Sequence, residues 1–314
     1  IPSFEYDEKA CTEAISNPVW NLLERGGKRW RPLLMKLAYL ITEGREKESI
    51  NKFLIIPELI HNGTLIIDDI EDDSESRRGK PCVHKLFGID IAVNAGNALY
   101  YLPLLALLKN NSLNSETKVR LYEIINEEMI KLHIGQGMDI YWHNNDCNVT
   151  ENQYLQMCAF KTGTLARISA KLGATLANGT EEQTNALGKF AESIGVAFQI
   201  QDDILNITND SWGKDFGEDI SEGKKSLIII KTFEQADETN KKRLFEILNA
   251  KTKDKNIVQE AINIIKKHSG IEDSKKVAEE LVSKAWEKLN LIFPESNSKN
   301  KLKLFADFMI KRKI

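Results

Sequence analysis

The sequence predicts an all-α fold, and three observations carry that prediction. Apolar residues recur at helical spacing along almost the whole chain, for example at Leu187, Phe190, Ile194 and Ala197. The polar breaks between these stretches are short, and the alternating patterns typical of strands are hard to find. We therefore expect one domain over residues 1–314, a bundle of roughly ten or more helices.

Two polar breaks end in signals for the start of a helix. Thr150 with Gln153 and Thr180 with Gln183 fit the capping box, in which the two side chains bond each other's backbone N–H groups. They predict helices that begin just after residues 150 and 180. Residues 53–70 are apolar on nearly all sides, which predicts a buried central helix whose few polar side chains need a reason.

Composition and charge exclude several classes of protein. The 43 Lys and Arg residues nearly balance 46 Asp and Glu residues, so the net charge of -3 gives no general attraction for nucleic acid. The four cysteines show neither zinc-type nor disulfide spacing. No apolar run of about 18 residues and no export signal is evident in the sequence. We expect a soluble, cytoplasmic protein without stable membrane insertion.

Carboxylates gather at two points where an apolar helix is expected to end. Asp68 and Asp72 lie four residues apart, so they share a helix face and can present oxygens to the same cation. About 130 residues later, Asp202 and Asn206 repeat that spacing. Acids are unfavourable at a helix C-terminus, which argues against a merely solvated end. Two such ends facing one another would hold Mg²⁺ against a polyphosphate.

Basic residues occur near both acidic segments. Lys28 and Arg31 follow a pair of glycines, and Arg77 and Arg78 follow the first acidic segment closely. Each basic residue alone is more often a solvated surface charge. As a set they suit phosphate groups, which arginine binds with a fork of donors and lysine binds as a point charge. The second acidic segment has its own set: Lys161, Lys214, Lys224 and Lys225.

These motifs, in this order, resemble those of the trans-isoprenyl diphosphate synthases. Residues 94–101 and 132–142 closely resemble the eukaryote-type geranylgeranyl diphosphate synthases of that family. Residues 68–72 match the family's first aspartate-rich motif, and residues 201–206 match the second. Residues 27–32 resemble its GKxxRP element, and residues 77–79 its RRG element. The resemblance implies the isoprenoid synthase fold, with helices around a central active-site cavity. It further implies a homodimer.

The resemblance also implies a reaction and a role for each site residue. Isopentenyl diphosphate would condense with dimethylallyl, geranyl or farnesyl diphosphate by ionisation, condensation and elimination, giving geranylgeranyl diphosphate. Three Mg²⁺ ions would be held by Asp68, Asp72 and Asp202. The allylic diphosphate would also contact Arg77, Lys161, Lys214 and Lys224, and isopentenyl diphosphate would contact Lys28, Arg31, His61 and Arg78. The allylic cation would be stabilised by Lys161, Thr162 and Gln199.

Chain length is predicted from residues below the first acidic motif. Gly63 and Thr64 lie about one turn deeper on the same helix, and both are small, whereas fifteen-carbon synthases carry aromatic rings there. Close helix packing is an equally good explanation of Gly63. By resemblance, Tyr100, Tyr101 and His133 would form a floor deeper in the tunnel. These residues favour a twenty-carbon product.

Other functions remain open at this stage. A class I terpene cyclase would share the fold and the first motif, but residues 209–213 do not continue as its second motif does. A catalytically silent synthase subunit would have lost ligands, and here both acidic motifs persist. A helical interaction protein would need no acids on buried helices. A synthase with a farnesyl product, or with one of twenty-five carbons or more, is the remaining alternative.

Overall fold

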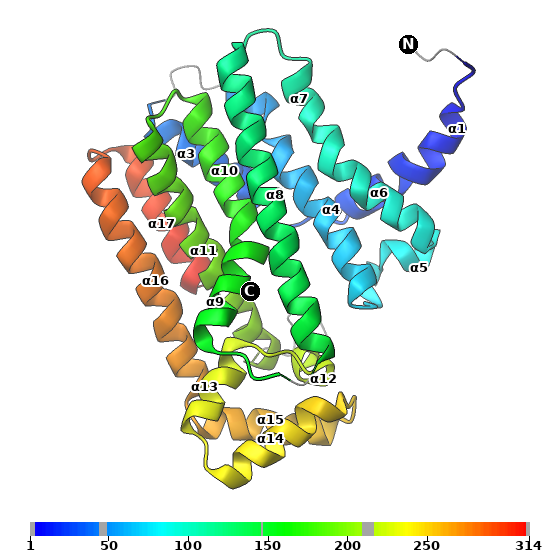
Figure 1. The fold of residues 1–314 in the computed structure, drawn as a ribbon, viewed down its shortest axis with the longest axis vertical. Helices are drawn as coiled ribbons and strands as arrows, with labels where there is room; N and C mark the ends of the chain where they lie inside the picture. The colour runs from blue at the N-terminus through cyan, green and yellow to red at the C-terminus, as the bar shows by residue number, and fades with distance from the viewer. Residues whose placement is uncertain (1–3, 44–48, 146, 209–216, 312–314) are drawn as a thin grey trace. The chain divides into compact units, whose positions relative to one another are not determined.

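The computed structural model describes residues 4–43, 49–145, 147–208 and 217–311. Within these ranges the chain is helical almost throughout, from α1 to α17 (Figure 1). The strands found there are β1 (Ser76–Arg77) and β2 (Lys80–Pro81), two residues each. The all-α prediction is confirmed.

The chain divides into two compact units. The first unit comprises residues 1–33 and 46–118, and the second comprises residues 34–45 and 119–314. Helices α3 (Trp30–Ile41) and α8 (Ser115–Asn144) contribute residues to both. The single domain expected over residues 1–314 stays a prediction.

The first unit is built around α4, the helix that carries the first acidic motif. Its core joins α4 to α2, α5 and α6 through Leu22, Ile66, Val83 and Leu99, all buried. The apolar residues of the motif-bearing helix therefore fix its position within the unit. Its elements are α1 (Glu8–Cys11), a π-helical turn (Thr12–Ser16), α2 (Asn17–Leu23), a 3-10 turn (Ser49–Lys52), α4 (Ile55–Glu71), β1, β2, α5 (Val83–Phe87), α6 (Ile89–Tyr101), a second 3-10 turn (Leu102–Leu104) and α7 (Leu105–Leu108).

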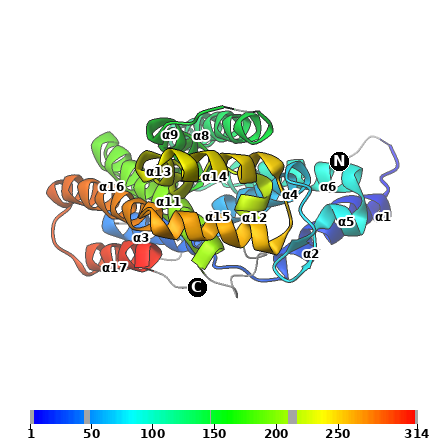
Figure 2. The ribbon, with the colours of Figure 1, turned by 90° about the horizontal axis from the view of Figure 1, so that it is seen from below.

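The second unit is built around α11, which carries the second acidic motif. Helices α10 and α16 pack along α11, where Phe190 meets Trp286 with ring centroids 5.4 Å apart (Figure 1). Helices α14 and α15 lie side by side (Figure 2). Its elements are α8, α9 (Glu151–Lys161), α10 (Gly163–Leu176), α11 (Glu181–Thr208), α12 (Glu218–Glu222), α13 (Leu227–Gln235), α14 (Glu238–Ala250), α15 (Lys255–Lys267), α16 (Gly270–Ile292) and α17 (Asn297–Lys311).

Both predicted capping boxes are present. The Thr150 hydroxyl accepts from the backbone N–H of Gln153 at 3.3 Å, and the Gln153 side chain accepts from Thr150 N–H at 2.9 Å. Thr180 and Gln183 make the same pair of bonds, at 3.2 and 3.0 Å. Helices α9 and α11 therefore begin where the sequence predicts, which fixes the register of the residues at their far ends.

One apolar stretch is longer than the sequence-based expectation allowed. Residues 89–108 have a mean hydropathy of 1.5 and sufficient length to cross a membrane, and 39% of that stretch is buried. It comprises α6, a 3-10 turn that contains Pro103, and α7. The expectation that no apolar run reaches about 18 residues is corrected. A single such stretch is weak support for a membrane span, because core helices meet the same criteria.

Candidate active site

The first acidic motif ends α4 as predicted. Asp72 caps the helix, and its backbone N–H donates to the Asp68 carbonyl at 2.9 Å, so the two residues are one helical turn apart. Both are half-buried. Asp69, between them, is buried and accepts from Arg77 Nε at 2.7 Å, while Asp68 Oδ2 lies 3.8 Å from Arg77 Nη2. Asp68 and Asp72 keep the exposure that a metal ligand needs, and Asp69 anchors the arginine.

Arg77 and Arg78 are presented by a short β-hairpin. Arg77 pairs with Lys80 across β1 and β2, and the two residues between them, Arg78 and Gly79, have φ of 53° and 75°. Two central residues with positive φ are typical of a type I′ turn, which explains the glycine of the RRG element. Arg25, which the sequence analysis did not select, donates to the carbonyl of Arg77 at 3.0 Å and holds the hairpin against α2.

Three arginines lie close enough to His61 to act on its charge. Burial lowers the pKa of His61 well below its usual range, and the positive charges of Arg31, Arg78 and Arg77 lower it further. His61 is therefore neutral at physiological pH and keeps one N–H donor. Arg31 is buried in the first turn of α3, whereas Lys28 is exposed just before that helix. A neutral donor among guanidinium groups suits an anionic ligand such as a diphosphate.

The predicted chain-length residues of the first unit have different environments. A Cβ at Gly63 would lie 2.8 Å from both the Gly96 carbonyl oxygen and Leu99 Cβ, so the glycine permits the close approach of α4 and α6. The packing explanation of Gly63 thus has direct support.

The other chain-length residues of this unit lie nearby in sequence. Tyr100 is half-buried beside Gly63, and burial together with the charges of Glu71 and Asp68 raises its pKa. Thr64 is half-buried, and its hydroxyl donates to the His61 carbonyl at 2.8 Å. Tyr101 is 71% exposed, and its place in the tunnel floor stays a prediction.

The second acidic motif lies in the last two turns of α11. Asp202 is half-buried, whereas Asp203 and Asn206 are buried. Asn206 Oδ1 accepts from the backbone N–H of Asp219 at 3.2 Å, so this side chain holds the start of α12. The roles of Asp202 as a metal ligand and of Asn206 as a supporting residue stay predictions.

Lys161, Thr162 and Gln199 meet at the break between α9 and α10. The Thr162 hydroxyl donates to Gln199 Oε1 at 3.0 Å, and Gln199 Nε2 donates to Asp203 Oδ1 at 2.8 Å. Lys161 Nζ is paired with Asp139 Oδ2 on α8 at 2.6 Å. The three residues assigned to the allylic cation are therefore neighbours in the second unit.

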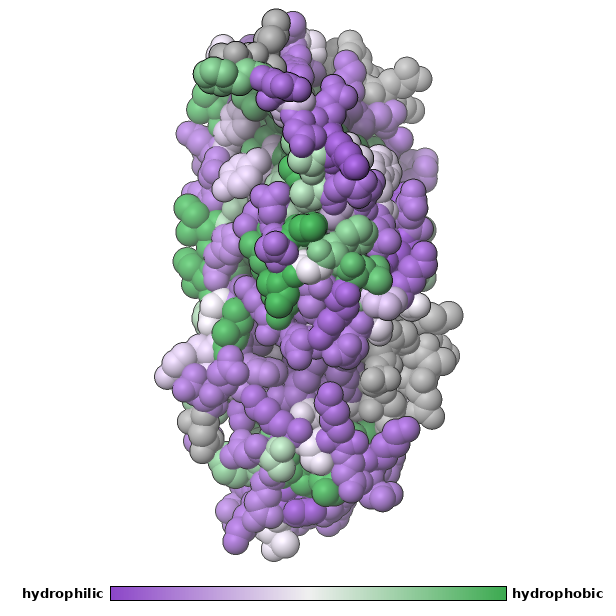
Figure 3. All heavy atoms as spheres, turned by 90° about the vertical axis from the view of Figure 1, so that its right-hand side faces the viewer, coloured by the Kyte–Doolittle hydropathy of each residue, from purple (hydrophilic) through white to green (hydrophobic). Residues whose placement is uncertain are grey.

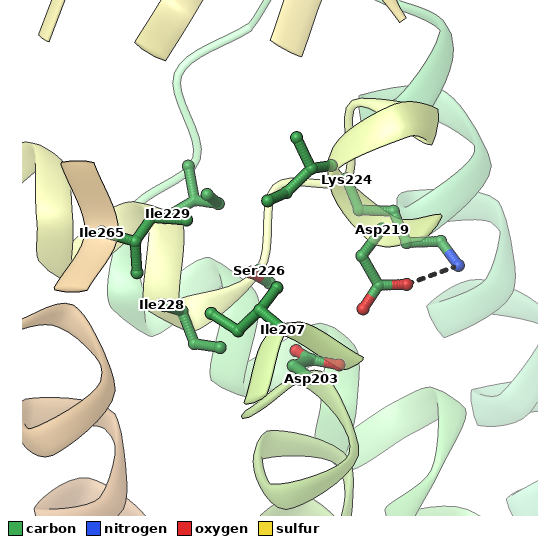
Figure 4. Close-up of a pocket in the computed structure, with 9 residues that line it drawn as sticks. Asp203, Ile207, Asp219, Lys224, Ser226, Ile228, Ile229 and Ile265 are labelled. Carbon is green, nitrogen blue, oxygen red and sulfur yellow. Dashed lines mark ion pairs between the residues drawn. The ribbon is translucent and has the colours of Figure 1, made fainter. Parts of the chain in front are cut away.

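Lys224 faces a pocket at the end of α11 (Figure 4). Its ammonium group lies 3.4 Å from Asp219 Oδ1 and 2.8 Å from Glu222 Oε2. Asp203 forms one wall, and isoleucines from α11, α12, α13 and α15 form the apolar part. The pocket is lined by Asp203, Ile207, Asp219, Ile220, Lys224, Ser226, Ile228, Ile229 and Ile265. Lys214 lies outside the described residues, and His133 is exposed on α8.

Comparison with known proteins decides the family. The polyprenyl synthetase family model matches residues 12–265. The chain belongs to this family. It is accordingly a prenyltransferase. A short chain isoprenyl diphosphate synthase of Methanothermobacter thermautotrophicus is 35% identical over 93% of this chain and 88% of its own length.

Two further similar proteins agree with this family. A geranylgeranyl pyrophosphate synthase of Dictyostelium discoideum is 33% identical, over 91% of each chain. The crystal structure of a geranylgeranyl pyrophosphate synthetase from Pyrococcus horikoshii superposes with a TM-score of 0.87 at 34% identity, covering 98% of this chain and 94% of that one. The predicted isoprenoid synthase fold is confirmed.

Three residues that support the polyprenyl synthetase motifs were not selected from the sequence. They are Arg25, Asp139 and Tyr154. Tyr154 is 2% exposed, and its hydroxyl donates to Asp203 Oδ2 at 2.6 Å. Each acts across a long sequence separation. A faint signal existed for Asp139, which follows Gly135 by one helical turn within the segment that resembles the family.

In the described part of the chain, no group of three or more His, Cys, Asp or Glu side chains is arranged to hold a metal ion. Magnesium usually binds to one or two carboxylates and completes its shell with water and substrate phosphate oxygens. The half-buried Asp68 and Asp72, one turn apart, satisfy that smaller requirement. These oxygen donors therefore fit Mg²⁺ bound together with a diphosphate.

The charge of Asp203 leads to a pH-dependent prediction. Burial raises its pKa to about 7, and the charge of Asp219 adds to the rise. The pKa of Asp203 in the folded protein is therefore higher than its pKa of about 3.9 in the unfolded chain. Ionised Asp203 destabilises the folded state, and this destabilisation is complete above about pH 7 and disappears as the pH falls towards 4. We expect Asp203→Asn to raise the melting temperature more at pH 8 than at pH 5. Thermal melts without magnesium or substrate measure this, and an equal or reversed difference would contradict it.

Proposed function

We propose that the chain condenses isopentenyl diphosphate with allylic diphosphates to give geranylgeranyl diphosphate. One observation in the first unit carries the proposal: Asp68, at the end of α4, lies 3.8 Å from Arg77, and Arg77, Arg78 and Arg31 act on a neutral His61. Carboxylates suited to Mg²⁺ thus adjoin cations suited to phosphate. The twenty-carbon product is supported by the names of the Dictyostelium and Pyrococcus proteins.

The proposed metal ligands are Asp68, Asp72 and Asp202, holding three magnesium ions. Bound magnesium would neutralise the charge that develops on the departing allylic diphosphate. The same anion would be bound by Arg77, Lys161, Lys214 and Lys224. Lys28, Arg31, His61 and Arg78 would bind isopentenyl diphosphate and orient its double bond for attack.

The allylic cation would be stabilised by oxygen dipoles of the second unit. Thr162 donates its hydroxyl hydrogen to Gln199 Oε1, which leaves the Thr162 oxygen lone pairs for the cation. The Lys161 carbonyl and the Gln199 amide would supply further dipoles. Such groups act on charge that exists only in the transition state and the intermediate, so they raise kcat.

Release of diphosphate tests the proposed reaction against its alternatives. We expect release from an allylic diphosphate only when isopentenyl diphosphate and Mg²⁺ are both present, and loss of release when the metal is chelated. Release without isopentenyl diphosphate would indicate a terpene cyclase instead. Absence of release under every condition would indicate a catalytically silent subunit.

Asn206→Asp should change turnover by less than about tenfold, below the 10–100-fold typical when a contact that supports a metal ligand is lost, because this variant keeps the contact. Asn206 Oδ1 accepts from Asp219 N–H, and an aspartate oxygen can accept the same bond. The measurement is kcat with saturating substrates and magnesium. A collapse of activity would place this side chain among the metal ligands.

We propose a homodimer, supported by an exposed apolar stripe on α8. Val119, Ile130, Ile134 and Tyr141 are between 49% and 63% exposed. Their spacings of 11, 4 and 7 residues, close to whole helical turns, put them on one side of the helix. Apolar side chains also reach the surface in patches on the face drawn in Figure 3. Light scattering of the purified protein should give twice the mass of 35.7 kDa.

The enzyme would act in the cytoplasm, with no nucleic-acid partner and no stable membrane insertion. The small net charge of -3 supports the absence of a nucleic-acid partner, because binding to nucleic acid needs a basic surface. If the protein does not insert into membranes, salt-washed membranes should retain none of it after cell fractionation.

A further inference from the structure

The break between α9 and α10 is held from two sides by helices that approach unusually closely. A Cβ at Gly195 of α11 would lie 2.8 Å from Gly163 Cα and 3.2 Å from the Thr162 carbonyl oxygen. A Cβ at Gly135 of α8 would collide with the backbone nitrogen of Lys161. The backbone at residues 161–163 therefore has little freedom to move, and what remains to be fixed is the direction of the side chains.

Each close-packed glycine is followed, one turn later, by the polar residue that binds a side chain at the break. Gly135 precedes Asp139, which pairs with Lys161 at 2.6 Å. Gly195 precedes Gln199, which accepts from the Thr162 hydroxyl at 3.0 Å. Close backbone approach thus brings the polar partners into hydrogen-bond range.

The direction of the Gln199 amide depends on Asp203. An amide can point either its oxygen or its nitrogen at a neighbour, and only its partners decide which. Asp203 Oδ1 accepts from Gln199 Nε2 at 2.8 Å, which turns Oε1 towards Thr162. Asp203 in turn accepts from the Tyr154 hydroxyl at 2.6 Å. All four side chains belong to the second unit and form one continuous chain of hydrogen bonds.

We propose that Tyr154 is a positioning residue for the prenyl transfer: through Asp203 it fixes the Gln199 amide with its oxygen on the Thr162 side. This inference rests on the proposed function, in which Gln199 and Thr162 stabilise the allylic cation. Tyr154 is 2% exposed and lies two turns before Lys161 on α9, and its hydroxyl bond to Asp203 links it to the Gln199 amide. Its loss would let the Asp203 carboxylate rotate and the Gln199 amide turn with it.

Tyr154→Phe tests the proposal, because it removes one oxygen and keeps the ring. We expect kcat to fall about ten- to a hundredfold and KM for both substrates to change less than about twofold, since the cation exists only beyond the ground state. The matched control is Tyr122→Phe on α8, which removes a buried hydroxyl for which the described residues offer no hydrogen-bond partner. That variant should keep the wild-type kcat.

The double variant Tyr154→Phe with Asp203→Asn covers the case in which the single variant does not fold, because it removes the orphaned carboxylate. If Tyr154 acts through Asp203, the double variant has the kcat of Asp203→Asn alone. A further drop in kcat in the double variant, or an unchanged kcat in Tyr154→Phe, overturns the proposal. Wild-type protein without condensation activity would overturn the proposed function and this inference together. An active wild type with an unchanged kcat in Tyr154→Phe would overturn this inference alone.

Exchange of the Gln199 side-chain amide protons gives a readout that needs no catalysis. We expect these protons to be protected in the wild type and to exchange at least about tenfold faster in Tyr154→Phe. The Tyr122→Phe control should leave them protected. Equal exchange rates in the wild type and in Tyr154→Phe would show that Tyr154 does not hold the amide, whatever its effect on kcat.

Discussion

Asp68→Asn and Asp202→Asn are each expected to lower turnover by at least about a hundredfold, the size of effect seen when electrostatic stabilisation of a transition state is removed. Each change keeps the shape of the side chain and removes one negative charge. Both aspartates are half-buried near helix ends, so neither substitution should unfold the protein. The measurement is kcat at saturating substrate over a range of magnesium concentrations.

A matched control for these variants is Asp254→Asn. Asp254 is exposed and caps α15 by accepting from Asn256 N–H at 2.8 Å, a bond that asparagine can also accept. This variant should keep wild-type turnover. Near-normal activity in Asp68→Asn or in Asp202→Asn would remove that residue from the metal site.

Gly63→Phe is expected to destabilise the first unit strongly. The first added carbon alone would lie 2.8 Å from the Gly96 carbonyl oxygen, and overpacking of a core costs about 1–3 kcal/mol even for smaller intrusions. The measurement is the melting temperature, with Gly137→Ala as control. Gly137 has open space around its Cβ position, so alanine there should stabilise α8 by about 0.5–1 kcal/mol.

The product of a folded Gly63→Phe enzyme would discriminate between the two explanations of this glycine. A shift towards farnesyl diphosphate with an unchanged melting temperature would favour a tunnel wall over helix packing. Thr64→Phe tests the tunnel separately, since Thr64 is half-buried and its hydroxyl bonds only its own helix among the contacts described. We expect this second variant to give the shorter product.

Local patterns explain why much of the fold was predictable. Helical spacing and the capping boxes at Thr150 and Thr180 depend on residues close in sequence, and the structure confirms both. The four-residue spacing of Asp68 and Asp72 likewise fixes their geometry once the helix is known. The family motifs added the roles of the basic residues, which spacing alone does not give.

What the sequence did not reveal depends on contacts between distant segments. Tyr154 reaches Asp203 across 49 residues, and Asp139 reaches Lys161 across 22. The space around Gly63 is filled by α6, which no pattern within α4 could show. Tyr101 and His133 are exposed, which depends on tertiary packing and could not be seen in the sequence. Their role in chain length stays a prediction.

Product analysis with labelled isopentenyl diphosphate, magnesium and each of the dimethylallyl, geranyl and farnesyl starters tests the proposed synthesis of geranylgeranyl diphosphate directly. We expect label to enter a product of twenty carbons from every starter that is accepted. A product of fifteen carbons, or of twenty-five or more, would contradict the assigned chain length. Failure of any label to enter a longer prenyl diphosphate would contradict the prenyl transfer itself.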